Sequence, residues 1–319
     1  MTDELEAYRG RRRGLRWTKV DHGLYRPGQD IGGPHDDLLA WRLVLPPSGA
    51  FTHLTAAREY GWWLPPLPED LPVFVSMAAH ESRPQRSALR VARHEEPPAP
   101  VTRDGLPLAP PSEVLLACAR DLGLLDTTVL VDAALFLGAS TLAELDAISR
   151  QRRRGAPILR RALRLADGRS ESAWESLLRM LHRACDVPVE PQYEVYDEHG
   201  TFIARGDLRI KGTRTLHEYD GGDHLERPRQ RKDLNRQRRL GHVRWTRRGY
   251  TSHEVLRQAV GILRDADASL GRPHHPERVR AWHALLAESL FTPSGTELLR
   301  ARWGLPPTRT GGERSAYGG

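Results

Sequence analysis

The chain has 319 residues, of which 39% are hydrophobic and 28% are charged, and this composition is typical of a folded globular protein with two or three domains. Its formal net charge of +7 favours an anionic partner, for which nucleic acid is the usual candidate. The two cysteines are isolated, which excludes a disulfide framework or a cysteine-rich zinc site, and without a signal peptide or membrane-spanning stretch we expect a cytoplasmic protein. Arginine supplies nearly all of the basic residues, as in GC-rich coding sequences, so charge alone is weak support for a nucleic-acid partner.

Residues 1–100 begin with a basic run, Arg11 to Arg13, and two short alternating stretches around the turn at Gly23. These stretches resemble the wing of a winged helix, but too few residues precede them to form its recognition helix. The basic arm either touches a phosphate backbone or is a solvated terminus. A helix is predicted over residues 52–60, and strands are predicted over 73–76 and 88–94.

Residues 101–168 are predicted to be helical. Ser112 can cap a helix over residues 113–125, and Thr141 with Glu144 has the spacing of a capping box. The arginine-rich stretch 150–164 carries an apolar stripe, which favours a packed helix with solvated arginines. We therefore expect a mostly helical N-terminal domain that carries a degenerate wing-like hairpin.

Residues 169–270 alternate between helix and strand patterns. After a helix that starts near Ser172, strands are predicted over 192–196, 202–210 and 215–219, followed by a helix from Pro228 to Gly241 and a strand over 242–246. Strand, helix, strand at this spacing is a crossover unit, so we expect a mixed sheet with helices on its faces, in the α+β or α/β class. Residues 271–319 are predicted to form a helical tail with a disordered end.

The stretch 201–224 combines a hairpin pattern with clustered acids. Gly212 at the first position of a two-residue connection favours a type II′ hairpin between the strands over 202–210 and 215–219. If Lys211 pairs with Arg214, Asp207 lies directly opposite Glu218. Asp220 then shares their face by the two-residue period of a strand.

Three carboxylates on one spot would form a hard oxygen site that suits Mg²⁺ rather than zinc. Carboxylates directly opposite one another destabilise a sheet unless a cation lies between them. The alternative is a solvated hairpin face on which Arg205 or Arg209 neutralises Asp207 without a metal.

Several short motifs resemble a known family in their order along the chain. They are SAWESLLR from Ser172, ARGDL at 204–208, HEYDGGDH at 217–224, KDLNR at 232–236 and RWTRRGYT at 244–251. In this order they resemble uncharacterised actinobacterial proteins whose C-terminal domain is similar to the very-short-patch repair endonuclease, of the PD-(D/E)XK nuclease superfamily. The resemblance covers about a third of the chain, and implies a restriction-endonuclease-like mixed sheet. More loosely, residues 101–165 resemble antitoxins of the AbiEi type.

The resemblance implies roles for individual residues. Asp207 would be the metal-binding aspartate, Glu218 the second acid and Glu175 an acid on the first helix. Asp220 departs from the family pattern, because the nuclease core normally has lysine there to assist the attacking water or stabilise the phosphorane. Lys232 or His224 are the candidates to replace that lysine, although Glu175 could instead cap its helix and His224 could only hold the loop.

A basic segment follows the acidic motif. It is predicted to contact DNA phosphates independently of sequence, or else to be the solvated side of a crossover helix. Its candidate nucleic-acid-binding residues are Arg229, Arg231, Lys232, Arg236 and Arg239.

Together these patterns favour a deoxyribonuclease that depends on Mg²⁺ or Mn²⁺ and hydrolyses DNA phosphodiesters, with Asp207, Glu218 and Asp220 as metal ligands. The main alternative is a catalytically inactive, nucleic-acid-binding regulatory protein related to antitoxins. A third is a scaffold that binds a protein partner. Oligomeric state cannot be predicted from these patterns.

Overall fold

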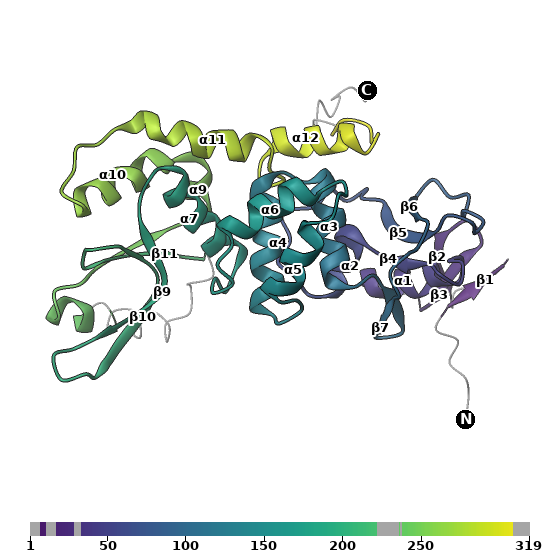
Figure 1. The fold of residues 1–319 in the computed structure, drawn as a ribbon, viewed down its shortest axis with the longest axis horizontal. Helices are drawn as coiled ribbons and strands as arrows, with labels where there is room; N and C mark the ends of the chain where they lie inside the picture. Colours follow the sequence, from purple (N-terminus) through teal and green to yellow (C-terminus); the bar gives the residue numbers. More distant parts are fainter. Residues whose placement is uncertain (1–6, 11–16, 29–32, 222–235, 237, 309–319) are drawn as a thin grey trace, which may run out of the picture.

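Three sheets are connected by a central group of helices in the computed structural model, which describes residues 7–10, 17–28, 33–221, 236 and 238–308. Figure 1 shows an elongated arrangement, with the N-terminal sheets at one end, the helices α3 to α6 in the middle and a four-stranded sheet at the other end. The last helices run back along one side towards the N-terminal part. No described helix combines the length and the apolar character needed to cross a membrane.

The N-terminal part contains two sheets. The hairpin predicted around Gly23 is confirmed, with Trp17 paired to Pro27 and Asp21 to Leu24. Residues up to 108 contain more strand than the predicted, mostly helical domain. The prediction missed β4 and β8, because these strands are too short to show an alternating pattern in the sequence. The strands are β1 (Tyr8–Arg9), β2 (Trp17–Asp21) and β3 (Leu24–Pro27) in one sheet, and β4 (Ala50–Phe51), β5 (Val73–Ala78), β6 (Leu89–His94), β7 (Val101–Arg103) and β8 (Leu106–Leu108) in the other, ordered β6-β5-β4-β8-β7.

The helices of the N-terminal half pack on the larger sheet and on one another. The capping box of Thr141 and Glu144 is confirmed, whereas Ser112 lies inside its helix because Pro110 is the N-cap and Pro111 the first helical residue. The helix α4 is buried on nearly all sides, which explains why its sequence is so apolar. These helices are α1 (Pro34–Arg42), α2 (His53–Glu59), α3 (Pro111–Asp121), α4 (Leu124–Phe136), α5 (Leu142–Ser149) and α6 (Ala156–Leu165).

The C-terminal sheet is mixed, as predicted. Its strand order is β12-β11-β10-β9, and only the pair β11–β12 is parallel. The helix α7 (Ala173–Ala184) precedes it, and the strands are β9 (Val189–Tyr196), β10 (Phe202–Ile210), β11 (Thr215–Tyr219) and β12 (Thr246–Tyr250). The last strand begins four residues later than predicted, because Trp245 N–H donates to the Leu240 carbonyl and Arg244 has a left-handed φ of 59°, so residues 240–245 form a turn.

The β10–β11 turn differs in type from the two-residue connection expected. Thr213 N–H donates to the Ile210 carbonyl, so Gly212, with φ of 80°, occupies the third position of a four-residue turn. That position requires a positive φ in a type II turn, which glycine accepts without strain. The Thr213 hydroxyl also accepts from Thr215 N–H, which stabilises this alternative.

Two large hydrophobic cores meet in the middle of the molecule. The first contains the larger N-terminal sheet and most of α1 to α6, and it also receives Leu299 and Trp303 from the C-terminal end. The second lies under α7 and the C-terminal sheet and receives Leu125 and Val129 from α4. The remaining helices are α9 (Ser252–Arg257), α10 (Ala259–Ser269), the 3₁₀ helix η1 (Pro276–Val279), α11 (Arg280–Ala287) and α12 (Pro293–Arg302).

Candidate functional site

The strands β10 and β11 bring Asp207 and Glu218 together. Leu208 pairs with His217 and Arg209 with Leu216, and this register places Asp207 opposite Glu218, as the sequence predicted. Asp207 Oδ2 accepts a hydrogen bond of 2.8 Å from Tyr219 N–H, which fixes the carboxylate over the neighbouring strand. The two acids therefore share one face of the sheet.

Glu218 is buried, with 3% of its surface exposed, and two arginines neutralise it. Arg236 forms a bidentate pair with it, at 3.0 and 2.7 Å, and Arg247 Nε lies 2.5 Å from Glu218 Oε2. Arg236 also donates to the Arg205 carbonyl. The cation that the paired carboxylates require is thus supplied by the chain itself, from the segment before β12 and from β12.

Neither of the arginines expected to neutralise Asp207 does so. Arg205 pairs with Glu171 at 2.6 Å, and Arg209 pairs with Glu190 at 3.2 Å. Both side chains therefore face other acids.

Asp207 has an unusually high affinity for a proton. Burial raises its pKa to about 7, and the negative charges of Glu175 and Glu218 act in the same direction. The Tyr219 N–H bond and Arg236 oppose the shift but do not cancel it. At neutral pH this carboxyl is poised between its protonated and ionised forms.

Glu175 lies in the first turn of α7 and contributes to the charge around Asp207. Its N–H donates to Ser172 Oγ at 3.2 Å, and its carboxylate accepts from Glu171 N–H at 2.8 Å and from Gln192 Nε2 at 2.9 Å. Burial raises its pKa, against the effect of the hydrogen bonds from Glu171 and Ser172. The helix is therefore capped by Ser172, and the Glu175 carboxylate binds the N–H of Glu171 before the helix rather than that of the N-cap.

Asp220 lies just beyond β11 and turns towards β12. Arg247 Nη2 donates to its Oδ1 at 2.6 Å, so one arginine joins Glu218 and Asp220. The carboxylate packs on Gly249, where an added methyl group would lie 1.6 Å from Asp220 Oδ2. Only glycine at 249 leaves room for this arrangement.

Among the described residues, no three Asp, Glu, His or Cys side chains are grouped as a metal site. Asp207 itself fits a divalent cation, because Glu175 and Glu218 place negative charge beside it and its Oδ1 accepts no hydrogen bond from a described residue. The oxygens of Glu218, in contrast, would have to exchange an arginine for a metal.

The other sequence-predicted residues are only partly described. Arg239 donates to the Phe202 carbonyl at 2.7 Å, and Arg236 binds Glu218. His224, Arg229, Arg231 and Lys232 lie outside the described residues.

Three residues of the site were not singled out from the sequence: Gln192, Arg247 and Gly249. Arg247 and Gly249 fall within the RWTRRGYT motif, and the parallel register, which pairs Glu218 with Gly249, shows why this motif belongs to the site. Gln192 has a left-handed φ of 51°, which no feature of the sequence predicts.

No protein-family model and no curated protein matches this sequence. Among solved structures, the crystal structure of the Rv2827c protein from Mycobacterium tuberculosis is similar with 15% identity, over 57% of this chain and 73% of that one, with a TM-score of 0.34. A similarity at that level supports no inference about this site.

Proposed function

We propose that this chain is a DNA endonuclease that depends on Mg²⁺ or Mn²⁺. The observation that carries the proposal is Asp207, a half-buried acid whose pKa is raised to about 7 by burial, Glu175 and Glu218. Such clusters of acids with raised pKa values are costly in a fold and are concentrated at functional sites.

The surrounding architecture supports the same function. The helix α7 is followed by a mixed sheet, in which three strands are antiparallel and the fourth is parallel to the third. This arrangement fits the fold implied by the resemblance to the very-short-patch repair endonuclease. The paired acids lie in the middle of this sheet, on its two central strands.

The residues of the site have separate chemical roles in this proposal. Asp207 would hold the cation, which when bound supplies Lewis-acid activation of water and of the phosphate. Burial raises the pKa of Asp207, and the negative charge of Glu175 adds to this effect. Arg236 and Arg247 place positive charge at Glu218, where it can stabilise charge that develops on a phosphate, the task that lysine at position 220 would usually perform.

A second candidate is a regulatory DNA-binding protein that does not cleave. The observation that favours it is that Arg236 and Arg247 already bind the carboxylates of Glu218 and Asp220. Ion-pair networks of this kind also occur as purely structural features, without any catalysis.

Plasmid cleavage with Mg²⁺ or Mn²⁺ tests the proposal in the wild type and in the variants Asp207→Asn and Glu194→Gln. We expect Asp207→Asn to lose cleavage and the increase in melting temperature caused by Mn²⁺, because the cation loses its charged ligand. Glu194→Gln, an exposed acid on β9, should behave as the wild type. Cleavage by Asp207→Asn at the wild-type rate would contradict the site, and DNA binding without any cleavage by the wild type would favour the regulatory candidate.

A further inference from the structure

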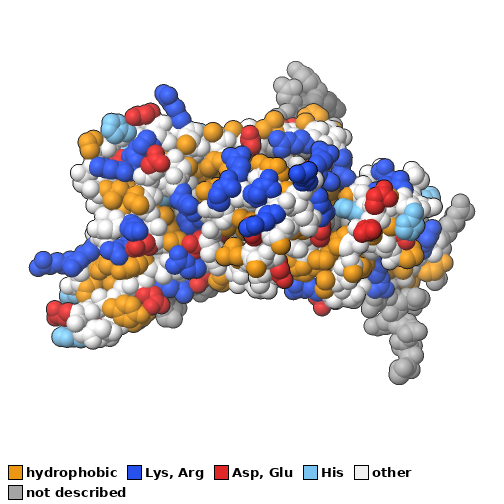
Figure 2. Space-filling view, in the orientation of Figure 1, with side chains coloured by type: hydrophobic (Ala, Val, Ile, Leu, Met, Phe, Trp, Pro, Cys, Tyr) orange, Lys and Arg blue, Asp and Glu red, His pale blue; other side chains and the backbone are white. Residues whose placement is uncertain are grey.

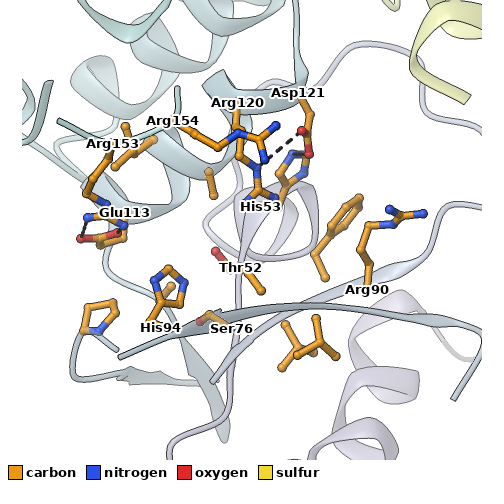
Figure 3. A pocket seen from close by; sticks show the side chains of 18 of the residues that line it. Thr52, His53, Ser76, Arg90, His94, Glu113, Arg120, Asp121, Arg153 and Arg154 are labelled. Carbon is orange, nitrogen blue, oxygen red and sulfur yellow. Dashed lines mark hydrogen bonds and ion pairs between the residues drawn. The ribbon is translucent and has the colours of Figure 1, made fainter. Parts of the chain in front are cut away.

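A cavity of about 490 Å³ lies in the N-terminal half, between the strands β5 and β6 and the helices α2, α3 and α12. Arginine side chains line it from four separate parts of the chain: Arg90 of β6, Arg120 of α3, Arg153 and Arg154 from the α5–α6 loop, and Arg302 of α12. Figure 3 shows the first four of them.

The carboxylates in this cavity do not balance the arginines. Both carboxylate oxygens of Glu113 accept from Arg153, in a bidentate pair with both distances at 2.7 Å. Asp121 lies 3.5 Å from Arg120. Among the described residues, Arg90 and Arg154 have no acidic partner, so an excess of positive charge lines the cavity.

A buried histidine in the lining also has a ring nitrogen without a hydrogen-bond partner. His53 is 1% exposed, and its Nδ1 has no hydrogen bond from any described group. Its Nε2 lies 3.3 Å from Asp121 Oδ2, close enough for an ion pair but without hydrogen-bond geometry. Its backbone is held at a left-handed φ of 53°. Strain and an unpaired buried polar group together are typical of a ligand site.

Size and lining indicate more than a bare inorganic ion. The volume falls in the range of roughly 300–1,000 Å³ that pockets for small organic ligands occupy. Apolar side chains, among them Val75, Val91 and Leu116, share the wall with the arginines. A single nucleotide, with one charged group and a less polar remainder, matches both properties.

The basic surface continues outside the cavity. Figure 2 shows Lys and Arg side chains gathered over the helices in the middle of the molecule. A second, shallower depression shares Arg120, Arg153 and Arg154 with the cavity and adds Arg150, Arg152 and Arg160. A strand of nucleic acid whose end enters the cavity would thus find cations for its next phosphates.

From this arrangement we propose that the cavity binds the terminal phosphomonoester of a nucleic-acid strand, with the adjoining nucleotides on the outer arginines. Guanidinium groups of the lining, Arg90 and Arg154 among them, supply the positive charge for the terminal phosphate, which carries more charge than a phosphodiester and accepts charge-assisted hydrogen bonds. The proposal does not depend on cleavage by the distant Asp207 site.

Binding of a short, internally labelled single-stranded DNA, in EDTA to prevent cleavage, tests the proposal. The strand carries either phosphates or hydroxyls at both ends, and fluorescence anisotropy reports its affinity. We expect the wild type to bind the phosphorylated strand about tenfold more tightly, and AMP to compete for the same site. Arg90→Gln and Arg154→Gln should each remove this preference.

Two further variants separate the parts of the surface. Arg152→Gln should weaken binding of both strands equally, and Arg161→Gln, exposed on α6 outside both depressions, should leave the preference intact. Equal binding of the two strands by the wild type, or a preference that survives both Arg90→Gln and Arg154→Gln, would overturn the proposal. If AMP binds as tightly as the strand and Arg152→Gln has no effect, the proposal of a nucleic-acid strand is wrong and the ligand is a free nucleotide.

Discussion

At Asp207, burial and two neighbouring acids act in the same direction on one carboxyl group. They raise its pKa from 3.8 to about 7, so the folded protein keeps a proton that the unfolded chain releases between these two pH values. Stability from this group is therefore fully present below about pH 4 and is lost as the pH rises through 7. Above that range the ionised carboxylate lowers the stability of the fold.

Asp207→Asn should consequently stabilise the protein at alkaline pH. We expect a free energy of unfolding up to about 4 kcal/mol above that of the wild type at pH 8, and a difference that shrinks as the pH falls towards 4. Urea unfolding at several pH values measures it, with the exposed Glu194→Gln as the control. A difference that does not vary with pH would show that the asparagine acts through packing rather than charge.

The sequence predicted the two acids of the site but not what neutralises them. The opposition of Asp207 and Glu218 depends on local alternation and a short turn, which a single hairpin determines. The contacts of Arg236 and Arg247 depend on where a later helix and strand return to the sheet. From the sequence alone, several arginines near the hairpin were equally good candidates to neutralise the acids. In the structure, Arg205 pairs with Glu171 and Arg209 with Glu190.

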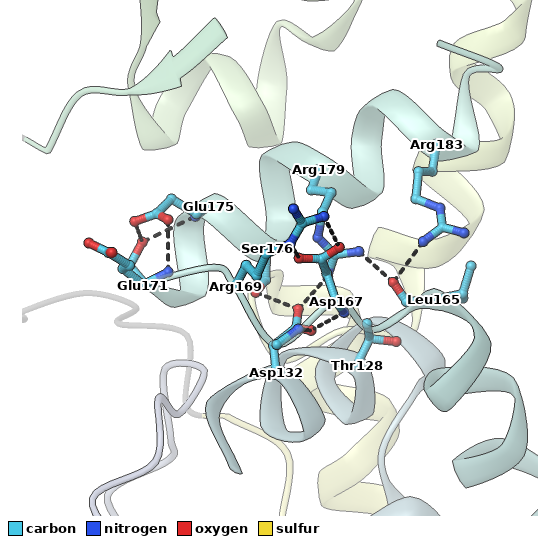
Figure 4. A network of polar contacts seen from close by, with 12 residues as sticks. Thr128, Asp132, Leu165, Asp167, Arg169, Glu171, Glu175, Ser176, Arg179 and Arg183 are labelled. Atoms are coloured by element: carbon cyan, nitrogen blue, oxygen red, sulfur yellow. Dashed lines mark hydrogen bonds and ion pairs between the residues drawn. The ribbon is translucent and has the colours of Figure 1, made fainter. Parts of the chain in front are cut away.

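At the level of elements, one buried carboxylate joins α4 to α7 (Figure 4). Asp132 Oδ2 accepts from the guanidinium of Arg179 and from Ser176 Oγ, and its Oδ1 accepts from the N–H groups of Asp167 and Gly168. The ion pair is almost fully buried, at 0% and 1% exposure of the two side chains. This network fixes the connection between α6 and α7 and thereby the position of the helix that carries Glu175.

Asp132→Asn should lower the free energy of unfolding by about 3 kcal/mol, because it leaves the buried Arg179 without an anion. The matched control is Asp146→Asn, whose exposed pair with Arg150 should be worth less than about 0.5 kcal/mol. Thermal or urea unfolding of both variants measures the two costs. Equal costs would mean that the network contributes no more than a surface ion pair.

Element boundaries were predicted best where a local signal sets them. The bounds of β10 and β11 and the capping box at Thr141 match the prediction. Ser112 and the start of β12 do not, because Pro111 and the left-handed Arg244 override the pattern of their neighbours. The short strands β4 and β8 form only because the larger N-terminal sheet pairs with them.

On the scale of the whole molecule, the C-terminal helix α12 closes the structure onto the N-terminal half. Arg300 forms a bidentate pair with Asp70, at 2.6 and 2.7 Å, across more than two hundred residues of sequence. Trp303 packs edge-on against both His53 and Phe74. Contacts at such separation leave no local pattern, so a helical tail could be predicted but not the place where it packs.

Removing the Trp303 side chain should therefore loosen the distant N-terminal half rather than the C-terminal sheet beside it in sequence. Trp303 is 2% exposed, and Trp303→Ala should cost about 3–5 kcal/mol in the core that it shares with α2 and β5. Hydrogen exchange should show lost protection in α2 and β5 while β10 and β11 keep theirs. Leu298→Ala, which removes a 47% exposed side chain from the same helix, should leave every segment protected as in the wild type. Equal loss of protection in β10 and in α2 would instead mean that the two cores unfold as one unit through α4, on which both of them pack.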